Sequence, residues 1–421
     1  MLVTLRQRNF ALIWVGGFVS LIGDRAMLTA LPFYIYQQTG STLDTAALFI
    51  AYYLPMALFG SIAGVFVDRW NRQRLMIVIN LLQAVVLLPL LLVRSSAWFW
   101  LIYLVAFVES SAAMFFGPAE RAIVPTLVGP EQLVPANALT GLNNNVARLV
   151  GPPIGGVLLA LFGLGGVVLA DSASFLVAGV LIARMSVTHK PSVTAGGDAE
   201  GSTDIVSAAV QVWRDWREGL WLVRRDRLLI ALFVVITVTS FGGSMIDPLY
   251  APFVGAILHG GPAALGWLSA TGAIGGVLAG VVAGRWGSKV QPWKLTAFGT
   301  VAVGLLMLAT YNQRSLPLVM ALNMLMFVPL VAAGVGTETL LQKGVRDAFR
   351  GRVFGAINTT IALVGLLSLG LAGIFGEIFG IVPMLSVAAG ITFLAGLFAL
   401  ALLPKASVLA EDVDKEVSEP S

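Results

Sequence analysis

Charged side chains occur inside several long apolar stretches of this sequence, where they are best placed to do chemistry. A charge at mid-bilayer costs at least about 2.5–3.5 kcal/mol on insertion scales, so each one needs a reason. A carboxyl group there can take up a proton when it is desolvated and release it near a cation or water. With only two histidines in 421 residues, carboxylates must do any such work. The charges in question are Asp24, Arg25, Glu109, Arg148, Asp171 and Asp247.

Asp24, Glu109 and Asp247 are predicted to couple protons, because each lies inside an apolar stretch. Arg25 and Arg148 are predicted to be their charge partners within the membrane. The alternative is that the carboxylates form fixed ion pairs with these arginines and never titrate. Asp24 and Arg25 are poor partners for each other, since adjacent side chains on a helix point about 100° apart.

Composition excludes several other kinds of site. The chain has no cysteine, which excludes disulfides, thiolate metal sites and cysteine nucleophiles. His189 and His259 lie far apart in the chain, so neither a zinc site nor a catalytic triad is expected. No glycine-rich segment is followed by Gly-Lys-Ser/Thr, which argues against ATP-driven work. We therefore expect no enzyme activity, no metal site and no cofactor.

The elements that position these charges are transmembrane helices. The chain is 57% hydrophobic and only 11% charged, against about 25% charged in soluble domains. An apolar stretch that crosses a membrane needs about 20 residues. Twelve such stretches are predicted, at 10–36, 44–67, 75–94, 98–118, 138–162, 166–186, 228–256, 263–284, 293–312, 316–340, 353–378 and 381–403.

The lysines and arginines orient this bundle. If the N-terminus is cytoplasmic, inner segments hold 22 of the 26 basic residues, whereas outer segments hold only Arg94 and Arg314. Basic residues favour the cytoplasmic side. We therefore expect the protein to span the plasma (inner) membrane several times, with both termini on the cytoplasmic side. The pI near 9.5 then indicates contact with anionic lipid headgroups and not with nucleic acid.

The longest polar segment divides the chain into two halves. Residues 1–188 are predicted to form one six-helix bundle and residues 228–405 another. Between them, 189–227 begins with a flexible Gly/Ser/Ala-rich part and ends in an amphipathic helix on the inner leaflet. A solvated tether is the alternative for this linker. The acidic segment 406–421 is predicted to be a disordered cytoplasmic tail.

An internal repeat supports the two halves. A shift of 216 residues aligns Arg69-Trp70 with Arg285-Trp286 and places glycines and a proline-tyrosine pair in register, without a gap over about 40 residues. Two six-helix repeats joined by a long cytoplasmic link match a known transporter architecture. The sequence therefore predicts an all-α membrane protein with twelve transmembrane helices in two pseudo-symmetric bundles.

The loop between the second and third predicted helices carries a recognisable motif. A glycine-rich helix end is followed by Asp-Arg and spaced basic residues, in the run Gly60-Ser-Ile-Ala-Gly64-Val-Phe-Val-Asp68-Arg69-Trp-Asn-Arg72-Gln-Arg74. This run resembles the signature loop of the major facilitator superfamily. Gly117-Pro-Ala-Glu-Arg121 and Arg350-Gly-Arg-Val-Phe354 further resemble its drug:proton antiporters, a branch that includes macrolide-efflux, siderophore-export and lysophospholipid-transporter proteins.

The resemblance implies a function. It predicts proton-coupled export of hydrophobic or amphipathic small molecules by alternating access, with membrane lipids around a monomeric protein. Alternatives with the same fold are a lysophospholipid flippase and a siderophore exporter. A non-transporting membrane sensor is an alternative from another class.

The resemblance also implies roles for residues in the spans. The first, fourth, seventh and tenth helices line the cavity in this superfamily, so Asp24, Glu109 and Asp247 are expected to face a common space. Many drug antiporters carry an arginine in the fourth helix, where this chain has Glu109. Asp171 is predicted as a further intramembrane charge partner, with a packing or hydrogen-bonding role favoured over substrate contact.

A conformational latch is expected at the signature loop. Asp68 interrupts a basic run and is expected to meet the positive N-terminal end of the eleventh helix. The alternative is a loop that is basic only for orientation. The predicted latch residues are Gly60, Gly64, Asp68, Arg69, Arg72, Arg74, Gly351 and Arg352.

Two further sets of residues are predicted from spacing. Small residues four apart let helix backbones approach closely, and the predicted packing residues are Gly151, Pro152, Gly155, Gly272, Gly276 and Gly280. Aromatic rings offer a surface for an apolar or cationic substrate, although packing is the alternative for any one of them. The predicted cavity residues are Phe33, Tyr34, Tyr52, Phe115, Phe116, Tyr250 and Phe253.

Overall fold

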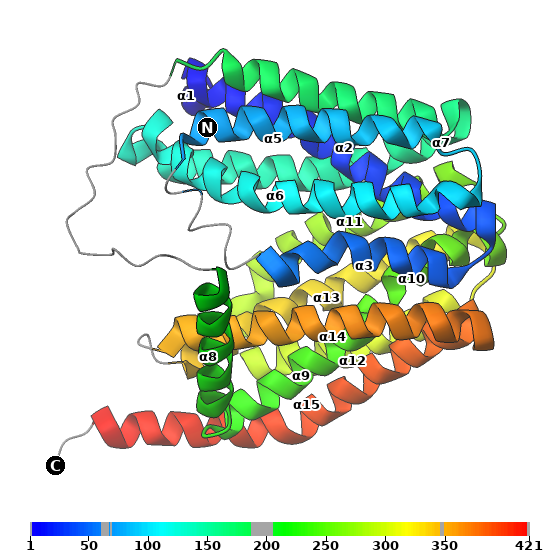
Figure 1. Cartoon of the computed structure of the whole chain (residues 1–421). Coiled ribbons are helices and arrows are strands. Elements are labelled where there is room, and N and C mark those ends of the chain that lie inside the picture. The colour runs from blue at the N-terminus through cyan, green and yellow to red at the C-terminus, as the bar shows by residue number, and fades with distance from the viewer. Residues whose placement is uncertain (1, 60–66, 68–69, 187–204, 346–348, 419–421) are drawn as a thin grey trace. The chain divides into compact units, whose positions relative to one another are not determined.

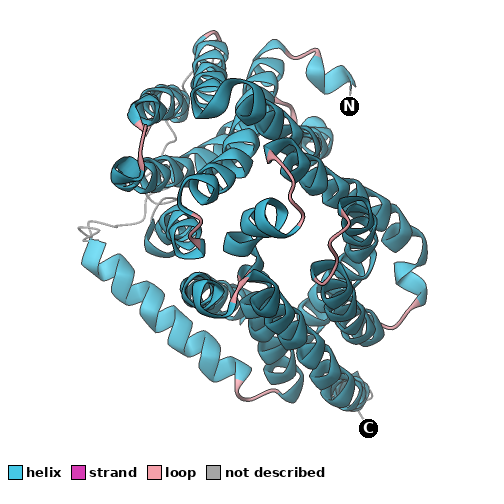
Figure 2. Ribbon diagram, turned by 90° about the vertical axis from the view of Figure 1, so that its right-hand side faces the viewer, coloured by secondary structure: helices cyan, strands magenta, loops and turns pink. Residues whose placement is uncertain are grey.

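The computed structural model of the chain describes residues 2–59, 67, 70–186, 205–345 and 349–418. The regular elements in these ranges are helices, and no strand occurs among them (Figure 2). Eleven helical segments there are long and apolar enough to cross a membrane. One of them, Pro130–Ala183, has 54 residues, more than two crossings of about 20 residues need. The predicted all-α membrane protein with twelve transmembrane helices is confirmed.

The helices follow one another along both halves of the chain (Figure 1). The first half of the chain contains α1 (Leu2–Leu5), α2 (Arg8–Thr39), α3 (Thr42–Phe59), α5 (Arg72–Leu87), α6 (Phe99–Leu127) and α7 (Leu133–Ala183). The second half contains α8 (Ile205–Val223), α9 (Arg227–Ser244), α10 (Ile246–Pro252), α11 (Pro262–Trp286), α12 (Pro292–Tyr311), α13 (Leu316–Gly344), α14 (Arg350–Phe379) and α15 (Ile381–Ser418).

Particular residues set the helix limits. Asn71 caps α5, because its side chain accepts a hydrogen bond of 3.0 Å from the backbone N–H of Arg74. Asp226 caps α9 in the same way, through the N–H of Leu228 at 2.7 Å. Gly163 has φ of 63° and breaks α7 into two crossings, a backbone conformation that glycine adopts without strain.

The starts of the helices repeat along the chain. Helices α9, α11 and α12 begin 219 or 220 residues after α2, α3 and α5, and helices α13 and α14 begin 217 residues after α6 and α7. Each half thus supplies the same series of crossings, as the internal repeat predicted.

The contacts divide the chain into two compact units. Unit 1 comprises Met1–Tyr34 and Ala51–Val212, and unit 2 comprises Ile35–Ile50 and Trp213–Ser421. The segment Ile35–Ile50, which contains the turn between α2 and α3, therefore groups with the second half, although the sequence analysis placed it in the bundle 1–188. Within unit 2, Thr42 Oγ1 donates to the carbonyl oxygen of Gly373 on α14 at 2.8 Å.

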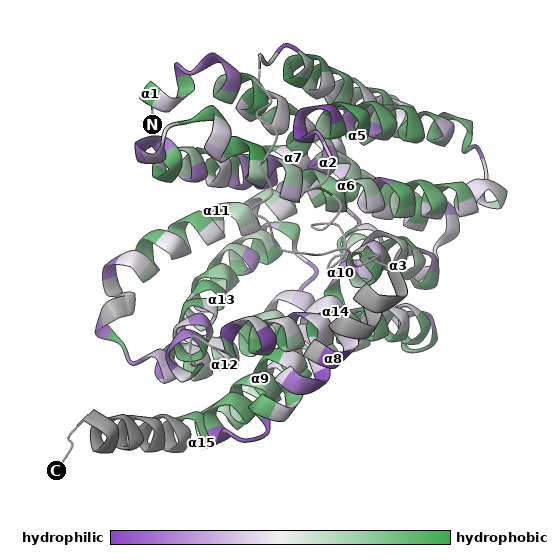
Figure 3. Ribbon diagram, turned by 60° about the vertical axis from the view of Figure 1, so that its left-hand side comes forward, coloured by the Kyte–Doolittle hydropathy of each residue, from purple (hydrophilic) through white to green (hydrophobic). Residues whose placement is uncertain are grey.

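Each unit packs its own helices. In unit 1, α5 lies against both α6 and α7, and in unit 2, α12 lies against α13 and α15 while α9 lies against α14 and α15 (Figure 1). Figure 3 shows that the helix middles are mainly apolar and that polar residues gather toward helix ends and in α8. This distribution is what lipid around the spans requires.

The part of α8 from Trp213 onward belongs to unit 2, where it contacts α14. Trp216 Nε1 donates to Thr360 Oγ1 at 3.1 Å, and Glu218 forms an ion pair with Arg352 at 3.5 Å. The rings of Trp213 and Trp221 are 56% and 53% exposed, so they remain available to lipid. The flexible first part predicted for the linker lies outside the described residues. Helix α15 continues to Ser418, beyond the predicted end of the second bundle at 405.

The glycines of α7 and α11 differ in what they contact. A methyl group at Gly155 would lie 2.6 Å from the Cα atom of Ala26 on α2. In α11, the close approaches are at Gly272 and Gly275, next to Phe327 and Met324 of α13. Around Gly276 the nearest contact is an ordinary 3.5 Å, and around Gly280 nothing described lies within 4 Å.

These contacts predict opposite effects for two identical substitutions. Gly155→Ala forces two backbones apart and is expected to destabilise the protein by about 1–3 kcal/mol. Gly280→Ala enters open space and is expected to be neutral or to stabilise by about 0.5–1 kcal/mol, because alanine favours the helix. Thermal unfolding of the purified variants in lipid nanodiscs measures both. Equal melting temperatures for the two variants would contradict this packing.

Candidate functional site

The middle of α2 lies between the two halves of α7. On one side, a methyl group added at Gly151 would lie 3.0 Å from the carbonyl oxygen of Ile22 and would meet the side chain of Arg25. On the other side, a methyl group at Gly23 would lie 2.5 Å from Oγ of Ser174. Because these glycines have no side chains, the helices approach closely and the charged residues between them are held in fixed directions.

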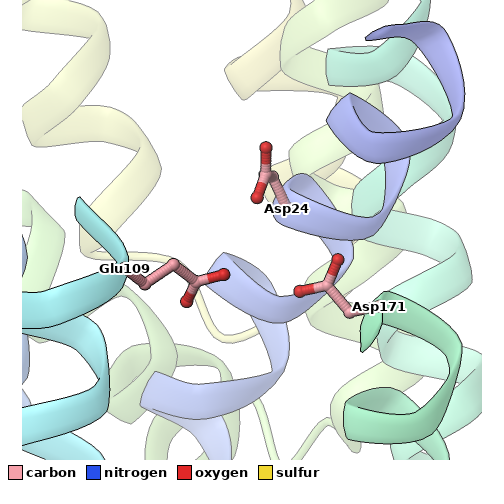
Figure 4. A group of neighbouring side chains, drawn as sticks. All are labelled: Asp24, Glu109 and Asp171. Carbon is pink, nitrogen blue, oxygen red and sulfur yellow. The ribbon is translucent and has the colours of Figure 1, made fainter. Parts of the chain in front are cut away.

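Three carboxyl groups from three helices converge in unit 1 (Figure 4). Asp24 comes from α2, Glu109 from α6 and Asp171 from the second half of α7, and one carboxylate oxygen from each lies within 4.8 Å of the other two. Asp171 is only 1% exposed, while Asp24 and Glu109 are partly buried. We call these three residues the carboxyl cluster.

The cluster has unused hydrogen-bonding capacity. Ser174 Oγ donates to Oδ1 of Asp171 at 3.2 Å. In contrast, Oδ2 of Asp171 and Oε1 of Glu109 are buried without a hydrogen-bond partner among the described residues. A buried polar atom left without a partner costs about 1–3 kcal/mol. A proton placed on one carboxyl group would let it donate to another and remove part of this cost.

Electrostatic repulsion also favours a proton on at least one of the three carboxyl groups. Two unit charges 4.8 Å apart repel by roughly 3 kcal/mol at an effective dielectric constant of 20. Three ionised carboxylates at this separation would carry that repulsion in each pair, so simultaneous ionisation is opposed. The cluster therefore suits a shared proton or a bound cation.

The carboxyl cluster is also the group of residues that could hold a metal ion. Hard cations such as Ca²⁺ take six to eight oxygen ligands. Three carboxyl groups would need water or backbone oxygens to complete that number. A proton needs none of these, and the cluster supplies both its donor and its acceptor.

Two tyrosines of α3 lie beside these charges. Tyr52 and Tyr53 pack edge to face with ring centroids 5.3 Å apart. Tyr52 lies within electrostatic range of Asp24, Arg25 and Glu109. Ser110 Oγ donates to the backbone oxygen of Tyr52 at 2.6 Å, which ties α3 to α6 next to Glu109.

The other predicted charges are two arginines and Asp247, and one of the arginines, Arg25, lies within electrostatic range of Asp24. Arg25 and Arg148 lie within electrostatic range of each other. No ion pair or side-chain hydrogen bond joins either guanidinium to another described residue. Asp24 and Glu109 belong to unit 1, whereas Asp247 opens α10 in unit 2. Asp171, predicted as a charge partner with a packing or hydrogen-bonding role, accepts a hydrogen bond from Ser174 and also lies in the carboxyl cluster.

The predicted aromatic residues are divided between the units. In unit 1, the Tyr34 hydroxyl donates to the carbonyl oxygen of Val93 at 3.4 Å, and Phe115 stacks on Trp70 at 6.5 Å. Phe33 is buried, and Phe116 packs against the core of unit 1. In unit 2, Tyr250 is partly buried. Phe253 is fully buried and lies edge-on to Tyr311, with centroids 5.5 Å apart.

Part of the predicted latch lies outside the described residues, namely Gly60, Gly64, Asp68 and Arg69. Arg72 and Arg74 begin α5. Gly351 and Arg352 lie in the first turn of α14, where Arg352 pairs with Glu218 of α8.

Comparison with known proteins agrees with this fold. The family model described as "Major Facilitator Superfamily" matches residues 13–241 and 232–420. The chain is 25% identical over 379 residues to macrolide efflux protein A of Streptococcus pyogenes. The alignment covers 89% of this chain and 90% of that protein.

Two solved structures share the fold. A mutant of the nucleoside transporter NupG superposes with a TM-score of 0.73 at 14% identity and covers 94% of this chain and 99% of its own. A bacterial homologue of the iron transporter ferroportin, in an inward-facing state, has a TM-score of 0.73 at 14% identity and covers 94% and 98%.

The contact between Gly23 and Asp171 predicts a measurable coupling. Gly23→Ala is expected to destabilise the protein, by about 1–3 kcal/mol, because its methyl group meets the Asp171 carboxylate and Ser174. In an Asp171→Ala background the loss is expected to shrink by about 1 kcal/mol or more, since one of the clashing groups is gone. Thermal unfolding of the four proteins of this cycle provides the measurement.

Gly17→Ala on the same helix is the matched control, because its nearest described neighbour, Glu120 Oε1, would lie at 3.9 Å. An identical effect of Gly23→Ala in both backgrounds would show that α2 and α7 do not meet at this point.

Proposed function

Because the chain belongs to the major facilitator superfamily, we propose that it exports hydrophobic or amphipathic small molecules and that protons moving inward drive the export. The chain is a multi-pass membrane transporter of a small-molecule substrate and not an enzyme. Export is supported by the match to macrolide efflux protein A along most of both chains. The proposal is for a monomer in the plasma (inner) membrane.

The carboxyl cluster is the observation that carries the proton coupling. In the proposed cycle, Asp24, Glu109 and Asp171 take up a proton while they are open to the outside and release it to the inside. Substrate moves in the opposite direction between these steps. Isolation of the cluster from water in between keeps the proton from leaking.

The energy available to such a cycle is sufficient. A proton moving inward through 100 mV releases about 2.3 kcal/mol, which supports roughly a fiftyfold gradient of a neutral substrate. Asp247, in the first turn of α10, is proposed as a separate carboxylate of the same cycle, contributed by unit 2.

Isosteric neutralisation tests the coupling. Asp24→Asn and Glu109→Gln are each expected to reduce proton-gradient-driven export by at least about tenfold, because the group that titrates is lost. Substrate binding and passive exchange are expected to remain. The measurement is flux into inverted vesicles, for a panel of neutral, cationic and anionic amphipaths that includes a macrolide, with a proton or a sodium gradient.

Asp44→Asn is the matched control, because Asp44 lies in the first turn of α3 at a helix end. Thermal stability is measured in parallel, since breaking a fixed buried ion pair would cost about 3–5 kcal/mol. Full gradient-dependent export by both neutralised variants would reject coupling at the cluster. If only a sodium gradient drives export, Na⁺ and not the proton is the coupling ion.

We also propose that both termini, α8 and the linker lie on the cytoplasmic side. The proposal is supported by the distribution of lysine and arginine and by the exposed Trp213 and Trp221 rings of α8, which suit a membrane interface. Arg225 lies over the Trp221 ring, 3.4 Å from its centroid, and so adds a cation beside this aromatic surface.

Single-cysteine labelling tests the orientation without background, since the chain has no native cysteine. A cysteine at Glu200 is expected to react with a membrane-impermeant maleimide only after the cells are opened. A cysteine at Gln313, in a predicted outer segment, is the control and is expected to react in intact cells. The reverse pattern would invert the proposed topology.

A further inference from the structure

Two arginines lie at the middle of membrane-spanning helices in unit 1. Arg25 follows the first residue of α2 by 17 positions and precedes its last residue by 14. Arg148 lies 15 positions after the start of α7 and 15 before Gly163. At about 1.5 Å per residue, each is roughly 20 Å or more from a helix end. That distance exceeds what an arginine side chain spans, so neither guanidinium reaches the end of its helix by extension.

Asp24 lies within electrostatic range of Arg25, but the two side chains form no ion pair. No hydrogen bond or ion pair joins the guanidinium of Arg25 or Arg148 to any residue in the ranges that the structure describes. The two cations lie within electrostatic range of each other and so repel. Arg148 is exposed, and Arg25 is partly buried. Two like charges without an ion pair in a span are costly, and such charges mark functional sites, of which an anion-binding site is one.

The contacts of α2 direct Arg25 toward the first half of α7 and the backbone next to Asp24 toward the second half, although Asp24 stays within electrostatic range of Arg25. Gly151, one turn after Arg148, faces the Arg25 side of α2, whereas Gly23 faces Asp171. The arginines therefore share the Gly151 side. A negative group bound there is attracted by two cations without first displacing an ion pair.

The surroundings of Arg148 are suited to an amphipathic ligand. Asn145, one turn earlier on α7, is exposed, and Asn144 donates to the carbonyl oxygen of Thr140 at 3.2 Å, so this stretch is polar. Tyr53 lies within electrostatic range of Arg148 and forms an edge-to-face pair with Tyr52. Guanidinium groups hold a carboxylate or phosphate through paired N–H donors, and the tyrosine rings offer an apolar surface beside them.

We propose that Arg25 and Arg148 bind the anionic group, a carboxylate or a phosphate, of the amphipathic molecule that the protein transports. The inference rests on the proposed function and narrows it, from amphipathic molecules in general to those that carry an acid group. An inside-negative membrane potential favours export of such an anion, by about 2.3 kcal/mol per charge for each 100 mV.

A pair of matched probes tests the site on the purified full-length protein in a neutral detergent. The probes are 11-(dansylamino)undecanoic acid and its primary amide, which share one apolar body and differ in the charge of one end. At pH 8 the acid is expected to bind the wild-type protein at least about tenfold more tightly than the amide, because only the acid forms charge-assisted hydrogen bonds. Dansyl fluorescence gives both dissociation constants.

Arg25→Gln and Arg148→Gln are each expected to weaken acid binding toward that of the amide and to leave amide binding unchanged. Unchanged amide binding also shows that the variants are folded. Arg25→Lys and Arg148→Lys keep the charge and are expected to retain part of the preference. Arg94→Gln, at an exposed position after α5, is the matched control and is expected to behave as wild type.

Equal binding of acid and amide by the wild-type protein would overturn the proposal. An equal loss of affinity for both probes in the glutamine variants would also overturn it. Nanodiscs of phosphatidylcholine with and without phosphatidylglycerol separate two sources of the anion. Displacement of the acid by phosphatidylglycerol would assign the site to a lipid headgroup. Binding of the acid at equal strength in both nanodiscs would assign it to a free substrate.

The outcome is independent of the export assay. An acid preference that depends on both arginines, together with an absence of gradient-driven flux, would reject proton-driven export and keep the anion site. Gradient-driven flux without an acid preference would reject the anion site alone.

Discussion

The close contact of α2 with both halves of α7 is the constraint on which the rest of unit 1 depends. At Gly151 and Gly155 the first half of α7 packs closely against the backbone of α2. At Gly23 the second half of α7 packs closely against α2 through Asp171. Because the middle of α2 cannot rotate between these contacts, Asp24 and Arg25 are directed to different neighbours. Asp24 is part of the carboxyl cluster, and Arg25 lies near Arg148.

This division gives one unit two electrostatic environments only a few residues apart. On one side, carboxyl groups from three helices oppose each other's ionisation and leave buried oxygens unpaired. On the other side, two guanidiniums have no partner among the described residues. Such separation of charge is costly inside a membrane, and it is expected where one kind of charge exchanges with a proton and the other receives a ligand.

Much of the fold is predictable from the sequence, because a crossing is specified by a long apolar run and little else. The break at Gly163 falls in the gap left between the predicted spans 138–162 and 166–186. The assignment of Ile35–Ile50 to unit 2 could not be predicted, since it depends on hydrogen bonds from the turn between α2 and α3 to α14.

The site was predicted less completely, since hydropathy does not tell how a helix is rotated about its axis. Asp24 and Glu109 were recognisable as charges in spans. For Asp171 the sequence predicts a charge partner with a packing or hydrogen-bonding role but not its place in the cluster, because only the tertiary contact at Gly23 shows which way its carboxylate points. The same limit applies to α11, where a four-residue spacing predicts Gly272, Gly276 and Gly280 while the close approaches in the structure are at Gly272 and Gly275.

The central claim is that proton movement accompanies substrate movement through the carboxyl cluster. Proteoliposomes loaded with a pH-sensitive dye test it most directly, when a substrate gradient is imposed at equal pH on both sides. The account predicts proton movement opposite to the substrate, absent from protein-free vesicles and from a variant with Asp24→Asn, Glu109→Gln and Asp171→Asn. Protein-dependent movement of substrate with no accompanying change in internal pH would contradict it.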